Sequence, residues 1–239
     1  MFATGTLINT GAVIGGGLLG IVLKKGIPER CQKVLMQACG VATIFIGVSG
    51  VLQKMLVIDQ GSLKTQGTFL LIFSLVLGSL IGSLLSIEDQ LERSGEWLKH
   101  KLHSRQDPHF VEGFVTATLV ICIGAMAIVG SIEDGLTGNF STLTAKTILD
   151  FVIILIFAST LGVGVIFSAI PLFLYQGAIT CVAALLGDFM SESLISDISF
   201  VGSALIFCVG VNVAFGKKFS VGNMLPALLI PILYALLPL

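Results

Sequence analysis

Charged residues divide this chain into long apolar stretches, and seven of these contain no Asp, Glu, Lys or Arg. They are residues 1–23, 34–53, 65–87, 113–132, 151–187, 198–216 and 219–239. The apolar core of a bilayer is about 30 Å thick and takes about 20 helical residues to cross. Six of the stretches therefore predict one membrane-spanning helix each.

The stretch 151–187 is different, because its 37 residues would form a helix of about 55 Å. Tilting does not accommodate a helix of that length in a bilayer. The stretch contains Gly162, Gly164 and Pro171, where a helix can turn or break. We therefore predict two crossings here and eight spans in total; a single crossing would give seven.

The distribution of Lys and Arg supports eight spans and predicts an orientation. With eight spans, the loops 24–33, 88–112 and 216–218 share one side of the membrane and carry ten Lys and Arg, against three on the other side. With seven spans, one side of the membrane carries eight Lys and Arg and the other side carries five. Loops rich in Lys and Arg face the cytoplasm, so we expect both termini to face outward. The first 23 residues lack a basic segment before their apolar run, so we expect a mature span and no cleaved signal peptide.

The longest polar segment lies within the connection between the third and fourth spans. Ile87, Leu91 and Leu98 follow helical spacing there, with charged residues between them. This pattern predicts an amphipathic helix at the cytoplasmic membrane surface, in a connector over 88–109. A simple interfacial connector is the favoured interpretation, with a docking or regulatory element as the alternative. We assign the whole chain, 1–239, to one transmembrane domain.

Composition excludes several classes of protein. The chain is 55% hydrophobic and only 11% charged, with a net charge of −1 and a mean hydropathy of +1.02. Soluble domains carry about 25% charged residues, so a soluble globular domain is excluded, and so are a disordered chain and a nucleic-acid-binding protein. The fold class is an all-α polytopic membrane bundle.

Motifs of enzyme active sites are absent from the sequence. It contains no HExxH, G-x-S-x-G or P-loop pattern. The five cysteines are isolated and mostly lie within apolar runs, so they are expected to pack as small hydrophobic side chains. We expect no enzymatic activity, no cofactor and no metal site.

Glycine spacing predicts close contacts between helices. The pairs Gly16/Gly20 and Gly78/Gly82 let helix backbones approach closely, within one chain or in a homo-oligomer. Residues 13–20 also resemble residues 75–82, and a looser third copy begins at Val182. The second and third copies would lie in two three-helix units of opposite orientation, formed by spans 3–5 and 6–8, as in many secondary transporters. The alternative is that Gly-rich apolar helices resemble each other through composition alone.

A few polar residues lie in or beside the predicted spans, where each must find a partner. The residues that we expect to bind a solute or ion are Asn9, Glu133, Asp134, Lys146, Asp150, Gln176 and Asn212. Lys146 and Asp150 are four residues apart and share one helix face. Asp150 then acts as a proton or cation relay, or the two form an interfacial pair that anchors the helix. The amides can line a cavity or simply join helices.

Several motifs resemble a known family. They are residues 28–30 (PER), 133–138 (EDGLTG), 145–151 (AKTILDF), 168–172 (SAIPL) and 223–229 (NMLPALL). With them the chain resembles, over essentially its whole length, the YqgA/YdfK-type bacterial inner-membrane family of unknown function. The resemblance implies a bacterial integral membrane protein and carries over no site residue.

Taken together, these features favour a small secondary transporter or permease of a bacterial inner membrane. Its partners would be the lipid bilayer and an unidentified small solute or ion, with a site near Asn9, Gln176 and Asn212. Asp150 or Glu133 would be the coupling carboxylate. A passive oligomeric channel and a non-transporting scaffold or partner subunit are the alternatives.

Overall fold

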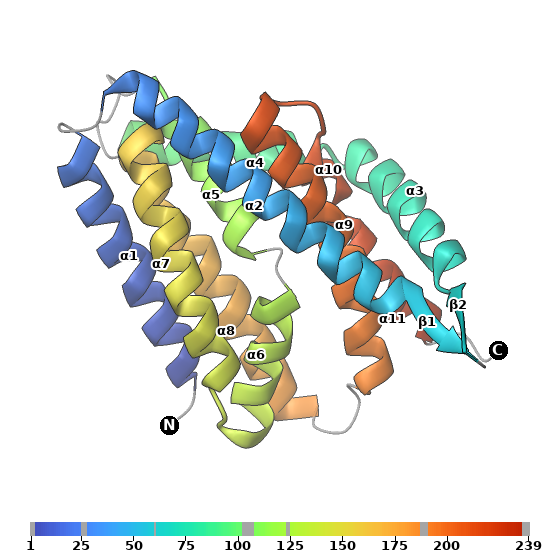
Figure 1. The fold of residues 1–239 in the computed structure, drawn as a ribbon. Coiled ribbons are helices and arrows are strands. Elements are labelled where there is room, and N and C mark those ends of the chain that lie inside the picture. Colours follow the sequence, from blue (N-terminus) through green and yellow to red (C-terminus); the bar gives the residue numbers. More distant parts are fainter. Residues whose placement is uncertain are drawn as a thin grey trace.

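The computed structural model describes residues 3–24, 28–59, 61–101, 108–122, 125–186 and 191–235, and it is a helical bundle (Figure 1). Helices are labelled α, strands β and 3-10 helices η. In chain order the elements are α1 (Thr4–Lys24), α2 (Glu29–Met55), β1 (Leu56–Asp59), β2 (Ser62–Thr65), α3 (Thr68–Leu84), α4 (Ile87–Lys101), α5 (Phe110–Cys122), α6 (Ala125–Thr137), α7 (Ser141–Leu161), η1 (Val163–Ser168), α8 (Ala169–Leu186), α9 (Glu192–Phe215), α10 (Val221–Met224), η3 (Leu225–Leu229) and α11 (Ile230–Ala235).

The helices confirm the expected all-α polytopic membrane architecture. Within the described residues, α1, α2, α7, α9 and the run from η1 through α8 are each long and apolar enough to cross a membrane. If each of two bent pairs, α3 with α4 at 53° and α5 with α6 at 73°, is one span, the number rises to seven. The last predicted span corresponds to the shorter run 221–235. The count of eight spans stays a prediction.

The chain reverses direction inside the long stretch 151–187. Helix α7 ends at Leu161, and Gly162 follows with φ 87° and ψ −158°, a conformation that is essentially restricted to glycine. Helix α8 then runs back in the direction opposite to α7 (Figure 1). The break ends just before Pro171, which lies in the first turn of α8. Proline removes no intrahelical hydrogen bond there.

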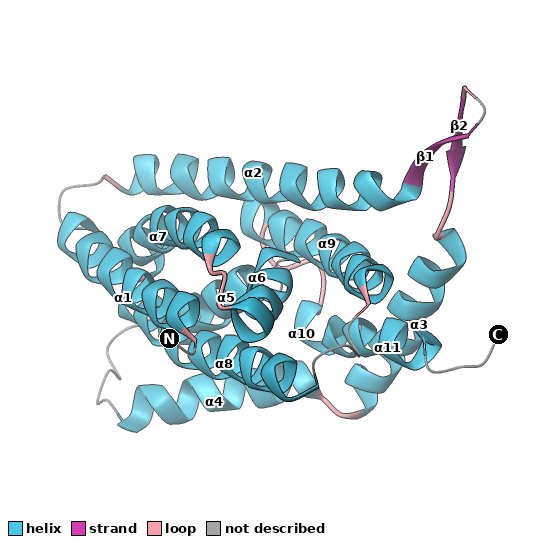
Figure 2. Cartoon of the chain, turned by 90° about the horizontal axis from the view of Figure 1, so that it is seen from below, coloured by secondary structure: helices cyan, strands magenta, loops and turns pink. Residues whose placement is uncertain are grey.

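The amphipathic segment forms the separate helix α4, which begins three residues after α3 ends. Seen from below, α4 lies along one edge of the molecule, across the direction of most of the bundle (Figure 2). Trp97 on α4 is 61% exposed, and the Lys101 ammonium lies 4.7 Å from the centre of its ring. Both features suit a helix at a membrane surface. Residues 102–107 of the predicted connector lie outside the described residues.

Between α2 and α3 the structure has a small β-hairpin that the sequence patterns do not indicate. Strands β1 and β2 pair antiparallel, with Leu56 opposite Thr65 and Asp59 opposite Ser62. The Lys64 ammonium pairs with the Asp59 carboxylate at 2.6 Å. The hairpin extends from the bundle (Figure 2), and it takes up the first residue of the stretch that was expected to be the third span.

Both glycine pairs lie at close contacts within the chain. A Cβ atom at Gly16 or Gly20 would overlap the backbone of α7 at Phe151 or Leu155. Gly78 and Gly82 lie equally close to the backbone of η3 and α10. Gly164 of η1 contacts the Phe110 carbonyl group at the start of α5 in the same way. These contacts account for the glycines without a second copy of the chain.

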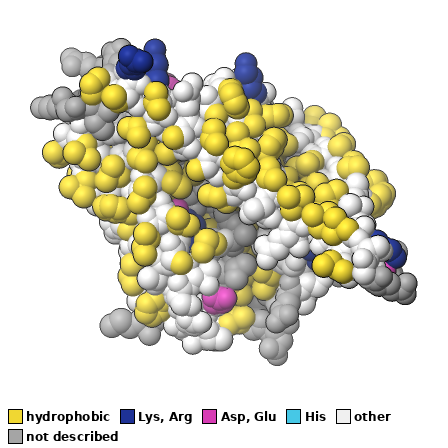
Figure 3. Space-filling model, in the orientation of Figure 1, with side chains coloured by type: hydrophobic (Ala, Val, Ile, Leu, Met, Phe, Trp, Pro, Cys, Tyr) yellow, Lys and Arg dark blue, Asp and Glu magenta, His cyan; other side chains and the backbone are white. Residues whose placement is uncertain are grey.

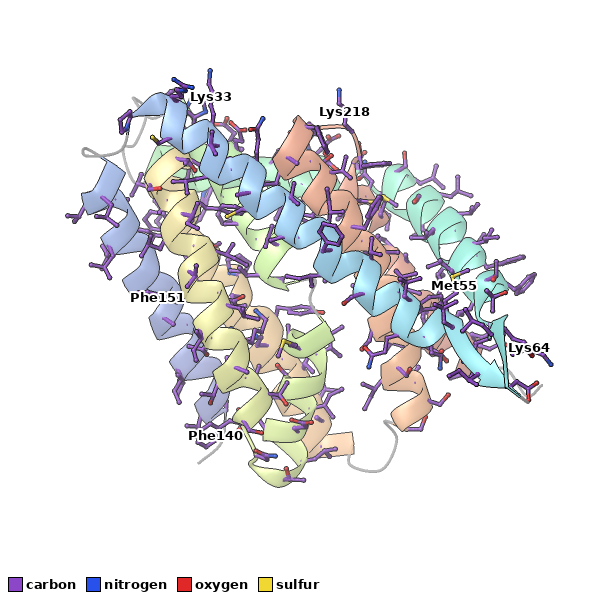
Figure 4. All side chains as sticks on the ribbon, viewed as in Figure 1. Lys33, Met55, Lys64, Phe140, Phe151 and Lys218 are labelled. Atoms are coloured by element: carbon purple, nitrogen blue, oxygen red, sulfur yellow. The ribbon has the colours of Figure 1, made fainter. Side chains whose placement is uncertain are left out.

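The surface has the character of a membrane-embedded protein. Hydrophobic side chains cover the middle of the face in Figure 3, and Lys and Arg side chains gather at its upper edge and right tip. Lys33 and Lys218 lie at the same end of the molecule, away from Lys64 and Phe140 (Figure 4). This placement agrees with the grouping of the basic loops. Which end faces the cytoplasm stays a prediction.

Candidate functional site

Four helices, α1, α6, α7 and α8, enclose a group of buried polar side chains, which we call the polar cluster. Each member is at most 5% exposed. The members are Thr6 and Asn9 on α1, Ser131 and Asp134 on α6, Lys146 and Asp150 on α7, and Gln176 and Thr180 on α8. Buried polar groups in a membrane-spanning segment are costly and usually functional.

Asn9 connects three of these helices. Its Nδ2 donates a hydrogen bond to Asp150 Oδ2 at 3.0 Å and another to Gln176 Oε1 at 3.3 Å. Asn9 Oδ1 and Gln176 Nε2 have no hydrogen-bond partner among the described residues. The two amides therefore keep one acceptor and one donor available inside the bundle.

Lys146 and Asp150 form an ion pair one turn apart on α7. Both side chains are buried, so the pair lies in the protein interior and not at a solvated helix end. Removing two charges from water is costly, and the mutual attraction offsets that cost only while both partners are present. The pair therefore depends on its surroundings, which include the Asn9 amide.

Asp134 adds a second carboxylate to the polar cluster. Its Oδ2 accepts a hydrogen bond from the backbone N–H of Gly5 at 3.0 Å. That N–H lies in the first turn of α1, where backbone donors lack an intrahelical partner and where the helix dipole favours a negative charge. Asp134 Oδ1 has no partner among the described residues. The cluster thus contains two carboxyl groups and one ammonium group.

Two residues that the sequence analysis grouped with this site lie elsewhere. Glu133 is only half-buried, and its Oε2 accepts a hydrogen bond from Thr142 Oγ1 at 2.7 Å. Successive residues on a helix point about 100° apart, so Glu133 and Asp134 do not share a face. Glu133 joins the end of α6 to the start of α7.

Asn212 is the second exception, and its expected place beside Asn9 and Gln176 is wrong. It lies near the end of α9, where its Oδ1 accepts hydrogen bonds from the backbone N–H groups of Lys218 at 2.8 Å and Phe219 at 2.9 Å. Its Nδ2 donates to the Phe219 carbonyl oxygen at 2.7 Å. The side chain therefore holds the turn after α9, and no atom of it is left for the cluster.

The sequence analysis did not assign Thr6, Ser131 and Thr180 to the site, although a signal for them exists. Each lies three or four residues from an assigned residue on the same helix, which places it on the same face. Thr6 precedes Asn9 and Ser131 precedes Asp134, both by three residues, while Thr180 follows Gln176 by four. A hydroxyl group in an apolar helix does not by itself indicate a binding site. Its spacing from an assigned polar residue on the same helix is the signal.

A cavity of about 1090 Å³ lies toward the other end of α7. Its wall includes apolar side chains such as Val115 and Leu119 of α5. The polar and charged residues at this cavity are Lys33, Gln37, Glu88, Glu92, His109, Glu112, Thr116, Thr160, Asn212 and Lys217. All of the charged residues among them belong to the predicted cytoplasmic loops or to their boundaries.

One ion-paired group joins α4 to the turn after α9 at this cavity. The Lys217 ammonium lies 2.6 Å from Glu88 Oε1 and 2.9 Å from Glu92 Oε1. The hydrogen bond to Glu88, followed by that to Glu92, raises the pKa of Lys217 above its usual value. The buried Glu88 carboxylate also accepts a hydrogen bond from the Gly222 N–H at 3.1 Å. This end of the cavity is thereby fixed to α10.

An apolar layer separates the cavity from the polar cluster. It includes fully buried side chains on α1, α5, α7 and α8, namely Val13, Ile121, Ile154, Phe157 and Leu172. Along α7 the order is Asp150, then Ile154 and Phe157, then Leu161 at the cavity. Asp150 and Leu161 are eleven positions apart, which is about 16 Å of helix, so the apolar layer is several side chains thick.

Two curated proteins that are similar to this chain have no described role, and one of them is named a membrane protein. The family described as "Protein of unknown function (DUF554)" matches residues 4–236. "Uncharacterized membrane protein YdfK" of Bacillus subtilis (strain 168) is 34% identical over 227 residues, covering 95% of this chain and 93% of the relative. "Uncharacterized protein YqgA" of Escherichia coli (strain K12) is 33% identical over 230 residues, with the same coverage. No solved structure matches significantly.

Among the described residues, no group of three or more His, Cys, Asp and Glu is arranged to hold a metal ion.

Proposed function

We propose that this chain, which belongs to the DUF554 family, is a small secondary transporter or permease. A curated relative of the chain is named a membrane protein. The polar cluster is its solute site. The cavity is the route to that site from one side of the membrane, and the apolar layer is the closed gate between them.

The observation that carries this proposal is the bridge that Asn9 forms between Asp150 and Gln176 inside the bundle. An ionisable group within a membrane span indicates function by default. Here the ion-paired carboxylate contacts an amide network that still has an unused donor on Gln176 and an unused acceptor on Asn9. A small polar solute with both a donor and an acceptor fits these groups.

The arrangement of cavity, layer and cluster favours a transporter over a passive pore. A pore needs a continuous polar path, whereas fully buried apolar side chains interrupt the path between the cavity and Asp150. A transporter alternates between states in which its site opens to one side or the other. The closed layer fits one such state, with the cavity open and the cluster sealed.

The proposed location is a bacterial inner membrane, with the cavity facing the cytoplasm and both termini facing outward. The excess of Lys and Arg in the loops 24–33, 88–112 and 216–218 supports this orientation. Lys33 and Lys217, from two of these loops, both line the cavity.

Thermal unfolding of the purified protein in detergent, with a panel of amino acids, carboxylates, sugars and nucleosides, tests the proposal. A solute present at a hundred times its Kd stabilises the folded state by about 2.7 kcal/mol. We expect one chemical class to raise the unfolding midpoint saturably, and the shift to disappear in Asn9→Ala and Gln176→Ala. Gln90→Ala, which changes an exposed amide outside the polar cluster and the cavity, is the matched control and keeps the shift. The absence of a shift, or a shift that Asn9→Ala and Gln176→Ala both retain, would contradict the proposal.

A further inference from the structure

We propose that the part of the polar cluster around Asp134 binds a dehydrated monovalent cation, for which Na⁺ is the probe. The inference rests on the proposed function and extends it by naming the chemical class of the coupling ion. Three independent observations support it: the balance of charges, the kind of atoms left without partners, and the convergence of three helices at this point.

The charges of the polar cluster do not balance without a further cation. The Lys146 ammonium is paired with Asp150, which also accepts a hydrogen bond from Asn9. Asp134 is 2% exposed, and among the described residues its carboxylate accepts a hydrogen bond only from the backbone N–H of Gly5. A buried carboxylate without a counter-ion costs several kcal/mol. A bound monovalent cation removes this cost.

Six atoms of the described polar cluster have no hydrogen-bond partner, and two of them belong to the amides Asn9 and Gln176. The other four are oxygen atoms on α1, α6 and α8: Oγ1 of Thr6, Oγ of Ser131, Oδ1 of Asp134 and Oγ1 of Thr180. Hard cations are bound by oxygen atoms of carboxylates, hydroxyls and carbonyls. A proton on Asp134 would neutralise the carboxylate and still leave most of these buried hydroxyl groups without partners. An oxygen-ligated cation satisfies them together.

Three helices bring these oxygen atoms to the same end of the bundle. The Gly5 N–H bond ties Asp134 to the turn of α1 that contains Thr6. On the other side, Gly135 packs so closely on α8 that an added Cβ atom would lie 2.5 Å from the Thr180 carbonyl oxygen. The start of α1 and the ends of α6 and α8 lie together in Figure 1. Ser131 lies one turn before Asp134 on α6.

The charge of the site selects a monovalent cation. Asp134 is the only carboxylate that remains without a charged partner in the described cluster, because Asp150 is paired with Lys146. Sites for Ca²⁺ commonly use several carboxylates, and Mg²⁺ keeps most of its water. One carboxylate surrounded by hydroxyl groups matches a single positive charge.

Direct binding of ²²Na⁺ to the purified full-length protein, measured by scintillation proximity in choline chloride, tests the site. We expect saturable binding that unlabelled Na⁺ competes. Asp134→Asn should lower the affinity about tenfold or more, the ratio that ~1.4 kcal/mol produces. Thr180→Val removes one oxygen at nearly constant volume and should lower the affinity less. Glu133→Gln, which changes the neighbouring carboxyl group that faces Thr142, is the matched control and keeps the affinity.

Five outcomes are decisive when thermal unfolding shows that each variant is folded. No saturable ²²Na⁺ binding by the wild-type protein, or unchanged binding by Asp134→Asn, overturns the cation site. Stabilisation that depends on pH but not on Na⁺ assigns a proton to Asp134 and also overturns it. A solute shift without ²²Na⁺ binding leaves the transporter proposal standing and removes the cation site. Binding of ²²Na⁺ without any solute shift supports the cation site and removes the solute site.

Discussion

Asn9 on α1 and Asp150 on α7, 141 residues apart in the chain, are joined by a hydrogen bond of 3.0 Å inside the bundle. The bond is formed because Gly16 and Gly20 let α1 lie against the backbone of α7. It orients the Asp150 carboxylate that also pairs with Lys146. One glycine-lined helix contact thus positions the charged part of the proposed site.

Asp150→Asn should destabilise the protein strongly, since it leaves the Lys146 ammonium buried without its counter-ion. Breaking a buried ion pair in this way costs about 3–5 kcal/mol. The double variant Lys146→Met/Asp150→Leu removes both charges and should recover most of the loss. Chemical unfolding in detergent measures both. An Asp150→Asn protein that is as stable as the wild type would mean that the pair is solvated.

Gly20→Val should destabilise the contact between α1 and α7. A side chain at Gly20 overlaps the Leu155 carbonyl group and the Ala158 side chain, and overpacking of this kind costs about 1–3 kcal/mol. Gly11→Ala is the control, because no atom lies within 4 Å of an added Cβ at that position. Equal unfolding midpoints for the two variants would argue against this packing.

The ion pair between Glu88 and Lys217 should persist through neutral and mildly alkaline pH. The two glutamates raise the pKa of Lys217 above the ordinary value of 10.5. A raised lysine pKa adds stability that is fully present below the unfolded-state value and is lost as the pH rises through the folded-state value. The difference in stability between wild type and Lys217→Met should therefore be constant near neutral pH and shrink only above 10.5. A difference that vanishes closer to neutral pH would contradict the pairing.

A cysteine introduced at the cavity should react with a maleimide reagent, whereas a cysteine introduced in the apolar layer should not. In a background without the five native cysteines, Thr116→Cys places a thiol on the cavity wall, and Ile154→Cys places one in the fully buried layer. A membrane-impermeant maleimide applied from the side of the basic loops should label Thr116→Cys and leave Ile154→Cys unlabelled. Equal labelling of both would indicate an open pore.

Much of the fold follows from local patterns in the sequence. The absence of charge marks most of the membrane-spanning helices, and Gly162 marks the reversal between α7 and η1 because only glycine suits its backbone angles. The four-residue spacing of Lys146 and Asp150 predicts their pairing. These features depend on residues that are close in the chain, so the chain alone reveals them.

Features that depend on helix packing do not follow from the sequence in the same way. Asn212 and Gln176 look alike as amides in apolar runs, yet one holds a turn and the other lies in the polar cluster. The glycine spacing indicates a close contact but not its partner. The apolar layer between cavity and cluster comes from four helices, and no single one of them shows it.

The measurement that tests the central claim most directly is solute efflux from proteoliposomes that contain the purified protein. They are loaded with a defined mixture of amino acids, carboxylates, sugars and nucleosides, and mass spectrometry follows the contents over time. We predict that one chemical class leaves faster than from protein-free liposomes, that an imposed Na⁺ gradient changes its rate, and that Asn9→Ala abolishes the efflux while the control Gln90→Ala retains it. Retention of every solute, or loss of all small solutes at similar rates regardless of the variant, would contradict the account.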